Sequence, residues 1–244
     1  MDKMIYEKNM DVTYYDLDYM GRMRLSSLTR LMNIAGDNHS KMMNVGYDDL
    51  KKKHLAFLLM KLGVKVYEFP KYNDVVTVRT WPLNPSGVSF VRNGDILDAS
   101  GCRMLEWSCI CALADLIKRK IVRPSALELY KFEIDPPEIC IEAKKLIFPA
   151  NESLDTSYTH IVTYRDVDLN MHLNNIVYFD IIMNSLPSDC ISDIHIKEIQ
   201  INYINEAGPG DEINVSYIKK GNEHFFKGYI GDTVCFIASL QHDK

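Results

Sequence analysis

The chain has 244 residues, 47% of them hydrophobic and 25% charged, with 28 Lys and Arg against 33 Asp and Glu. This is the composition of a globular protein with room for one large domain or two of moderate size, and it argues against disorder. The net charge of −5 argues against nucleic acid as the main partner, because nucleic-acid binding usually needs a concentrated basic face.

The first residues, MDKMIY, lack the apolar core and small-residue cleavage site of a secretory signal. The longest apolar run, 55–60, is far shorter than the roughly 18 residues of a membrane span. The six cysteines show no CxxC spacing, and Cys109 and Cys111 fit small buried hydrophobes on one face of a strand. We therefore expect a cytoplasmic protein without a membrane span, metal or cofactor.

The first half of the chain predicts one helix followed by strands. Apolar residues recur at spacings of three and four, as the buried face of an amphipathic helix requires, and Ser26 or Ser27 is expected to cap the helix. These apolar residues are Leu25, Leu28, Leu31, Met32 and Ala35. Period-two runs then predict strands at 64–67, 74–78, 89–97 and 103–113. Asn93-Gly94 interrupts the third run, so a bulge or an earlier turn is an open alternative there.

The second half repeats this order. VTYYDLD at 12–18 and VTYRDVD at 162–168 are identical at five of seven positions, at an offset of 150. A second helical pattern follows, which Asn174 is expected to cap. Its apolar residues are Leu173, Ile176, Phe179, Ile182, Met183 and Leu186. Strand-like runs then lie at 199–203, 211–215, 224–230 and 233–240.

The shared order of strand, helix and antiparallel strands predicts two α+β modules rather than βαβ winding. Proline and polar residues concentrate around 135–153 and mark the boundary. We predict an N-terminal module at 1–137, a linker at 138–152 and a C-terminal module at 153–244. A single module would leave sheet edges exposed, so we expect the two sheets to pair within the chain.

The run DVDLNMHLNN at 166–175 gathers carboxylate, amide and imidazole groups. If this run is extended, Asp166, Asp168, Asn170 and His172 share one face and the apolar residues between them share the other. Such an arrangement suits a site more than a solvated loop. Asp16 and Asp166 occur in both repeats, so we interpret these two as turn or cap residues.

The pattern Asp168-x-Asn170-x-His172-Leu173-Asn174-Asn175-x-x-Tyr178 resembles the DxNxHVNNxxY signature of acyl-acyl-carrier-protein thioesterases. These are tandem double-hotdog proteins of bacteria and plant plastids. Blocks at 15–22, 46–50, 80–82 and 122–124 resemble the N-terminal half of the same family. The resemblance implies an α+β double hotdog, in which each module wraps an antiparallel sheet around a central helix.

The family also carries a glutamate within a pattern like EYRRExG, and Glu206 takes that place in NYINEAG. Plant members commonly have a cysteine directly after this glutamate. Ala207 stands there in this chain, which excludes a cysteine mechanism at that position. The resemblance therefore implies a catalytic set of Asp168, Asn170, His172 and Glu206.

Thioester hydrolysis needs an activated water and a polarised carbonyl. We expect Glu206 and His172 to share the work of base and orienting group, Asn170 to polarise the carbonyl and Asp168 to support them. A covalent acyl-carboxylate step through Asp168 is an open alternative.

The repeat indicates one active site per chain. It aligns Met20 with Asn170, Arg22 with His172 and Phe69 with Glu206. The N-terminal copy therefore lacks the amide, the imidazole and the second carboxylate. We expect it to shape the acyl pocket instead.

The predicted function is release of fatty acid from acyl carrier protein, by a monomer or a homodimer. An acyl-CoA thioesterase and a non-catalytic acyl-binding module are the alternatives, and a hotdog dehydratase fits the spacing less well. Because the carrier is acidic in this family, one basic run could form the docking face. These runs are at 51–54, 118–120, 144–145 and 219–220.

Overall fold

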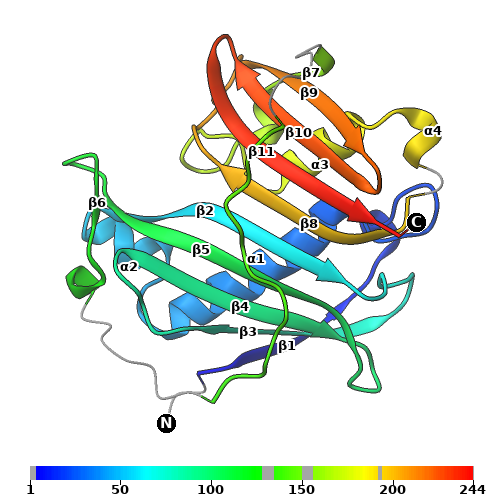
Figure 1. Cartoon of the computed structure of the whole chain (residues 1–244). Coiled ribbons are helices and arrows are strands. Elements are labelled where there is room, and N and C mark those ends of the chain that lie inside the picture. Colours follow the sequence, from blue (N-terminus) through cyan, green and yellow to red (C-terminus); the bar gives the residue numbers. More distant parts are fainter. Residues whose placement is uncertain (1–3, 128–134, 150–155, 192–193, 244) are drawn as a thin grey trace.

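The computed structural model describes residues 4–127, 135–149, 156–191 and 194–243. The strands form one antiparallel sheet in the order β1-β3-β4-β5-β2-β8-β11-β10-β9-β7, and β6 pairs with β5 (Figure 1). Helices pack on this sheet, so the molecule is α+β, as predicted from the order of the elements.

The N-terminal half contributes β1 to β6 and two helices. Its elements are β1 (Tyr6–Asp11), α1 (Leu25–Met42), α2 (Tyr47–Lys52), β2 (Leu55–Val66), β3 (Val75–Pro82), β4 (Ser89–Leu97), β5 (Arg103–Asp115) and β6 (Lys120–Val122). The C-terminal half contributes the remaining strands and two helices. These are β7 (Thr156–Ile161), α3 (Val177–Asn184), α4 (Ser188–Ile191), β8 (Ile196–Tyr203), β9 (Glu212–Lys220), β10 (Glu223–Ile230) and β11 (Thr233–His242). All eight predicted strand runs are confirmed, and β4 passes through Asn93-Gly94 without a turn.

The internal repeat is visible in the backbone. Strands β1 and β7 are related by the same offset of 150 residues, and a short 3-10 turn follows each of them, at 14–16 and 164–166. In both turns the aspartate is a cap: Asp16 Oδ2 accepts from Thr13 Oγ1 at 2.7 Å, and Asp166 Oδ2 accepts from Thr163 Oγ1 at 2.7 Å. The interpretation of Asp16 and Asp166 as structural residues is confirmed.

Neither expected capping residue stands at the N-cap position, which is Arg24 for α1 and Ile176 for α3. Helix α1 begins at Leu25, and Ser26 and Ser27 are buried in its first turn, so the serine caps were wrong. The helix starts early because Leu17 pairs with Met23 and holds the chain extended up to Arg24. In the second half, Asn174 Oδ1 accepts from the Ile176 N–H at 3.1 Å, in the turn that leads into α3.

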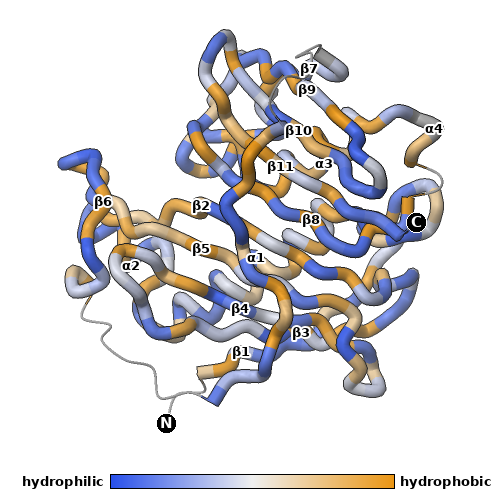
Figure 2. The backbone as a smooth tube through the Cα atoms, in the orientation of Figure 1, coloured by the Kyte–Doolittle hydropathy of each residue, from blue (hydrophilic) through white to orange (hydrophobic). Residues whose placement is uncertain are grey.

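Both halves share one core. The predicted apolar face of α1 is buried, and so are Phe179, Ile181 and Ile182 of α3, within a single cluster that spans both halves. Along the strands, hydrophobic and hydrophilic positions alternate (Figure 2). One side of the sheet therefore supports the helices, as period-two patterning requires.

The two half-sheets join edge to edge. Strand β2 pairs with β8 in antiparallel register, with Lys61 opposite Asn202 and Lys65 opposite Glu198. The expected pairing of the two sheets within the chain is confirmed. This joint covers two edges that would otherwise be exposed.

Residues 135–149 cross the sheet as a strap (Figure 1). The side-chain amides of Gln200 and Asn202 in β8 hydrogen-bond to the backbone of the strap, each through both its oxygen and its nitrogen. Gln200 Oε1 accepts from the Lys144 N–H at 3.1 Å, and Asn202 Nδ2 donates to the Lys144 carbonyl at 2.8 Å. This segment includes most of the predicted linker. The predicted boundaries at 137 and 152 remain predictions, and residue 152 lies outside the described residues. Among the described residues, no helix combines the length and apolarity needed to span a bilayer.

Candidate active site

The motif at 166–175 is a closed loop rather than an extended run. Val167 pairs with Leu173, and the Asp168 N–H donates to the His172 carbonyl at 2.8 Å. Met171 takes a left-handed conformation, with φ 62°, which lets the chain reverse. The expectation of one shared polar face is therefore wrong: Asp166 and Asp168 line two different cavities.

Asp168 organises this loop. Its Oδ1 accepts from the backbone N–H groups of Asn170 at 2.8 Å and His172 at 3.3 Å, and Asn170 Nδ2 lies 3.5 Å from its Oδ2. These bonds hold the Asn170 and His172 backbone in a fixed turn. The Asn170 side chain is exposed beside them.

His172 and Glu206 lie together although they are far apart in sequence. His172 Nε2 is 3.3 Å from Glu206 Oε2, and the side chains are 44% and 61% exposed. The Leu173 N–H donates to the Ala207 carbonyl at 2.8 Å and ties the two segments. An imidazole and a carboxylate at this distance can share a proton and hold a water molecule.

Two tyrosines lie near this pair, Tyr178, which is buried, and Tyr203, which is partly buried. Tyr178, the last residue of the motif, packs edge to face on Tyr203 at 5.2 Å between ring centroids. Burial raises the pKa of Tyr178, and the nearby Cys235 and Glu206 add to the rise. Burial also raises the pKa of Tyr203, whose hydroxyl lies 3.4 Å from the Asn175 carbonyl. Both phenols therefore stay protonated at neutral pH.

A cavity of about 340 Å³ lies between α1 and the N-terminal half of the sheet. Most of its lining is apolar and comes from the N-terminal half, including Leu62, Phe90 and Trp107. The motif loop closes one part of the wall. That part consists of Asp168, Asn174 and Asn175. Asn170, His172 and Glu206 are outside this lining, so the structure places them beside the cavity rather than within it.

The same cavity contains a residue that the sequence reasoning missed. Arg92 of β4 lines it, next to Cys109 and Cys111, which share a face as predicted. The guanidinium Nη1 lies 3.0 Å from Nδ1 of His39, which is buried. A signal was present, because a charged residue directly follows Phe90 and Val91 in a strand-like run.

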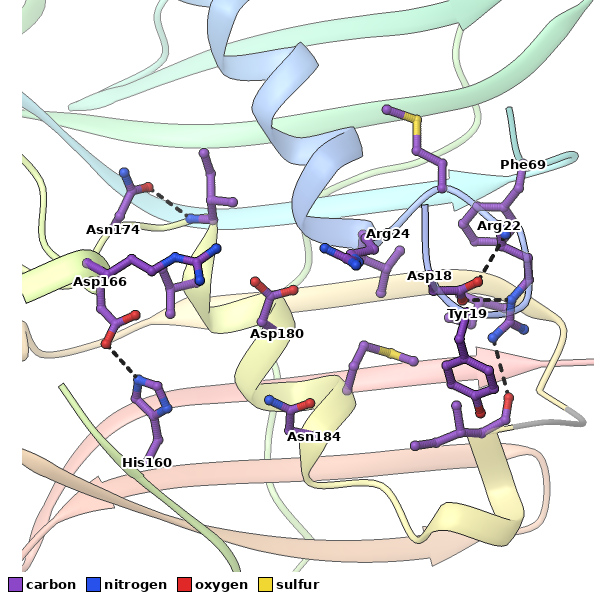
Figure 3. Close-up of a pocket in the computed structure, with 18 residues that line it drawn as sticks. Asp18, Tyr19, Arg22, Arg24, Phe69, His160, Asp166, Asn174, Asp180 and Asn184 are labelled. Atoms are coloured by element: carbon purple, nitrogen blue, oxygen red, sulfur yellow. Dashed lines mark hydrogen bonds and ion pairs between the residues drawn. The ribbon is translucent and has the colours of Figure 1, made fainter. Parts of the chain in front are cut away.

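A second cavity, of about 670 Å³, lies at the equivalent place in the other half (Figure 3). Its lining includes Asp18, Arg22 and Phe69, which align with Asp168, His172 and Glu206. Backbone hydrogen bonds support the last equivalence. The N–H groups of residues 67 and 68 both donate to one carbonyl, of residue 104, and those of residues 204 and 205 both donate to the carbonyl of residue 235.

In this twin cavity, the guanidinium of Arg22 stands where the imidazole would be. Arg22 Nε is 3.1 Å from Asp18 Oδ2 (Figure 3). Its Nη1 donates to the Ile194 carbonyl at 2.8 Å. Arg22 thus fastens its loop to the C-terminal half. Phe69 cannot act as a base. The twin cavity does contain an imidazole and a carboxylate, His160 Nε2 and Asp166 Oδ2 at 3.3 Å (Figure 3), but Asp166 is the cap of the turn at 164–166, and neither residue stands at the position equivalent to His172 or Glu206.

The sequence matches two family descriptions in tandem. Residues 3–127 match the acyl-ACP thioesterase N-terminal domain, and residues 149–231 match the acyl-ACP thioesterase C-terminal domain. Oleoyl-acyl carrier protein thioesterase 1 of Arabidopsis thaliana is 20% identical over 237 residues, 87% of this chain and 63% of the relative. Palmitoyl-acyl carrier protein thioesterase of Cuphea hookeriana is 22% identical over 85% of this chain and 53% of the relative. The chain therefore spans less than two thirds of these relatives.

Solved structures agree with this fold. An acyl-ACP thioesterase from Bacteroides thetaiotaomicron superposes with a TM-score of 0.86 at 20% identity, covering 99% of both chains. A 12:0-ACP thioesterase from Umbellularia californica gives 0.87 at 17% identity, covering 100% of this chain and 98% of that one. The predicted α+β double-hotdog architecture is confirmed.

Proposed function

Because the chain belongs to the acyl-ACP thioesterase family, we propose that it hydrolyses the thioester of fatty acyl-acyl carrier protein. The reaction releases free fatty acid and ends fatty acid synthesis. The observation that carries this proposal is the 3.3 Å approach of His172 to Glu206, beside a loop whose Asp168 lines a mostly apolar cavity.

In the proposed mechanism, Glu206 and His172 hold a water molecule between them and accept its proton as it attacks the thioester carbon. The Asn170 side-chain amide donates to the carbonyl oxygen, where negative charge develops. The tetrahedral intermediate then collapses and breaks the C–S bond. The protonated imidazole returns the proton to the leaving thiolate.

Direct attack by water is favoured over a covalent step through Asp168. The Asp168 Oδ1 already accepts two backbone N–H groups, from Asn170 and His172. These bonds engage the lone pairs of Oδ1 in holding the loop. We therefore assign Asp168 the role of fixing the loop and placing Asn170 and His172.

The cavity of about 340 Å³ is the proposed acyl pocket. Its apolar lining comes from the N-terminal half, whereas the reacting groups come from the C-terminal half. The N-terminal half would thus bind the acyl chain, and the C-terminal half would cleave the thioester. In the second cavity, Arg22 and Phe69 occupy the positions equivalent to His172 and Glu206, which supports one active site per chain.

A basic docking surface for the acidic carrier is proposed at the end of the sheet where β2 begins. Two exposed basic runs meet there, at 51–54 and 118–120, because the Leu116 N–H donates to the His54 carbonyl at 2.9 Å and Asp115 pairs with Lys120. Strand β8 is antiparallel to β2, so the segment from Tyr203 to Glu206 runs toward the same end. The proposal includes a cytoplasmic location and a monomer or homodimer.

An assay of thiol release tests this function. Purified protein is offered the same acyl group on acyl carrier protein and on CoA, and the His172→Ala variant serves as the control. We expect release from the carrier that depends on His172. Faster release from CoA would favour the acyl-CoA thioesterase, and binding without release would favour the non-catalytic module.

A further inference from the structure

The proposed acyl pocket contains a positive charge. Arg92 reaches from β4 across the space between the sheet and α1, and its Cδ lies 3.8 Å from the place that a Cβ on Gly36 would take. Its neighbours on the sheet are apolar pocket residues, because Phe90 and Arg92 share a strand face and Cys109 lies opposite Arg92. Arg92 therefore places a charged side chain across a cavity whose remaining lining is mostly apolar.

The hydrogen bonds of Arg92 are incomplete. A guanidinium has five N–H donors. Among the described residues, Nη1 has His39 Nδ1 at 3.0 Å and Thr80 Oγ1 at 3.4 Å, and Nη2 has Ser40 Oγ at 3.5 Å. Only the first of these is short, and the Nε–H and a second Nη2–H have no partner there. These donors belong to a side chain that lines the cavity.

The charge of Arg92 is also not neutralised at close range. No carboxylate of the described residues lies within the 4.0 Å of an ion pair with it, whereas Arg79 and Arg103 both pair with Asp95 on the same sheet. Asp37 lines the same cavity, and its charge favours the protonated form of Arg92 through space. Burial lowers the pKa of Arg92, but an arginine keeps its proton at neutral pH.

A saturated acyl chain would cover these donors without accepting from them. Leaving a buried donor unpaired costs about 1–3 kcal/mol, and more for a charged group. An oxygen atom on the chain removes this cost. A site that hydrogen-bonds a polar group of its substrate strongly rejects an analogue without that group. An apolar pocket discriminates much less against a substrate with an added methylene or hydroxyl group.

We propose that Arg92 determines specificity by recognising an oxygen acceptor on the acyl chain. The preferred substrates would then be oxygenated acyl thioesters, which carry a hydroxyl, oxo or carboxylate group where the chain passes Arg92. This inference rests on the proposed function, and it adds the substrate class. The competing role for Arg92 is a plain stop that limits the length of a saturated chain.

The test compares carriers loaded with saturated, hydroxylated, oxo and terminal-carboxylate acyl chains, matched at each chain length. The variants are Arg92→Met, which keeps the length and removes the donors, and Arg92→Lys, which keeps the charge. Arg165→Met is the matched control, because Arg165 is exposed and lines the other cavity. Thermal unfolding of each variant confirms that it is folded.

We expect the wild type to prefer one oxygenated chain over its saturated match by at least about tenfold in kcat/KM. Arg92→Met should abolish this preference, Arg92→Lys should keep part of it and Arg165→Met all of it. An unchanged preference in Arg92→Met would overturn the proposal. So would a wild type that prefers saturated chains, with Arg92→Met accepting longer ones, since that result identifies a plain stop.

Calorimetric binding of the free oxygenated and saturated fatty acids separates this inference from the proposed function. Tighter binding of the oxygenated acid by wild type, lost in Arg92→Met, would support the role of Arg92 even if no thiol were released. Equal binding of both acids by both proteins would contradict it, whatever the catalytic activity.

Discussion

At the scale of single residues, Asp168 combines two roles that a substitution can separate. Its carboxylate fixes the motif loop through two backbone N–H groups, and it also lines the proposed acyl pocket. Sequence reasoning selected this residue as part of the motif, and its role in the reaction stays a prediction. It could not foresee the loop, because the turn depends on the left-handed backbone of Met171, a residue type that rarely adopts it.

Asp168→Asn should leave the loop intact, because an amide oxygen still accepts from both N–H groups. We expect its free energy of unfolding to stay within about 0.5 kcal/mol of wild type. Asp168→Ala should lose about 1–3 kcal/mol, because the loop donors lose their acceptor. Denaturant unfolding of both variants measures the difference. Equal stability of the two would show that the carboxylate does not hold the loop.

His224 predicts a dependence of stability on pH. It is 1% exposed, and burial, with the nearby His242 and Lys219, lowers its pKa to about 4. The unfolded chain protonates this group near pH 6.5, so it binds more protons than the folded chain below that pH. The stabilisation is complete above pH 6.5 and is lost as the pH falls toward 4, by up to about 3 kcal/mol.

Unfolding by urea at pH 7.5 and at pH 4.5 measures this effect. The His224→Asn variant removes the titrating group, and we expect a smaller loss of stability between the two pH values than in wild type. His195→Asn, at an exposed position, is the control. If wild type and His224→Asn lost the same stability on acidification, His224 would not be the group responsible.

At the scale of elements, much of the fold was readable from local pattern. The strands follow from period-two runs, and the two capped turns follow from the repeated VTYxDxD. What could not be read depends on contacts between elements. The start of α1 follows the Leu17–Met23 pairing, and His39 of α1 is contacted by Arg92 of β4, which is distant in sequence.

The strap at 135–149 should contribute to stability through Gln200 and Asn202. Each amide both donates to and accepts from the strap backbone, so each substitution by alanine leaves partly buried backbone groups unpaired. We expect losses of about 1–3 kcal/mol for Gln200→Ala and for Asn202→Ala. Asn214→Ala is the control, because its amide bonds only exposed side chains. Losses no larger than that of the control would show that the strap is not held by these amides.

The loop at 18–22 offers a second prediction about elements. Arg22→Met removes its bonds to Asp18 and to the carbonyls of Ile194 and Ile191. We expect about 1–3 kcal/mol of lost stability and a kcat within about twofold of wild type, since the twin cavity takes no part in the proposed chemistry. Arg24→Met, at an exposed neighbouring position, should change neither quantity. A large fall in kcat for Arg22→Met at unchanged stability would assign the twin cavity a catalytic role.

At the scale of the whole molecule, the site belongs to both halves. The β2–β8 joint turns two sheets into one, and it places the motif loop of the C-terminal half against a cavity of the N-terminal half. Sequence reasoning assigned chemistry to one half and the acyl pocket to the other. It could not place Arg92 in that pocket, because the slot exists only once α1 and the sheet have packed together.

The central claim is that His172 and Glu206 act as one unit on the thioester. The most direct measurement is a double-mutant cycle of thiol release with His172→Ala, Glu206→Gln and the double variant. We predict that each single substitution lowers kcat by about 10²–10⁴-fold, and that the double variant is little worse than either. A double variant whose fall in kcat equals the product of the two single falls would contradict the account. So would a Glu206→Gln variant as active as wild type.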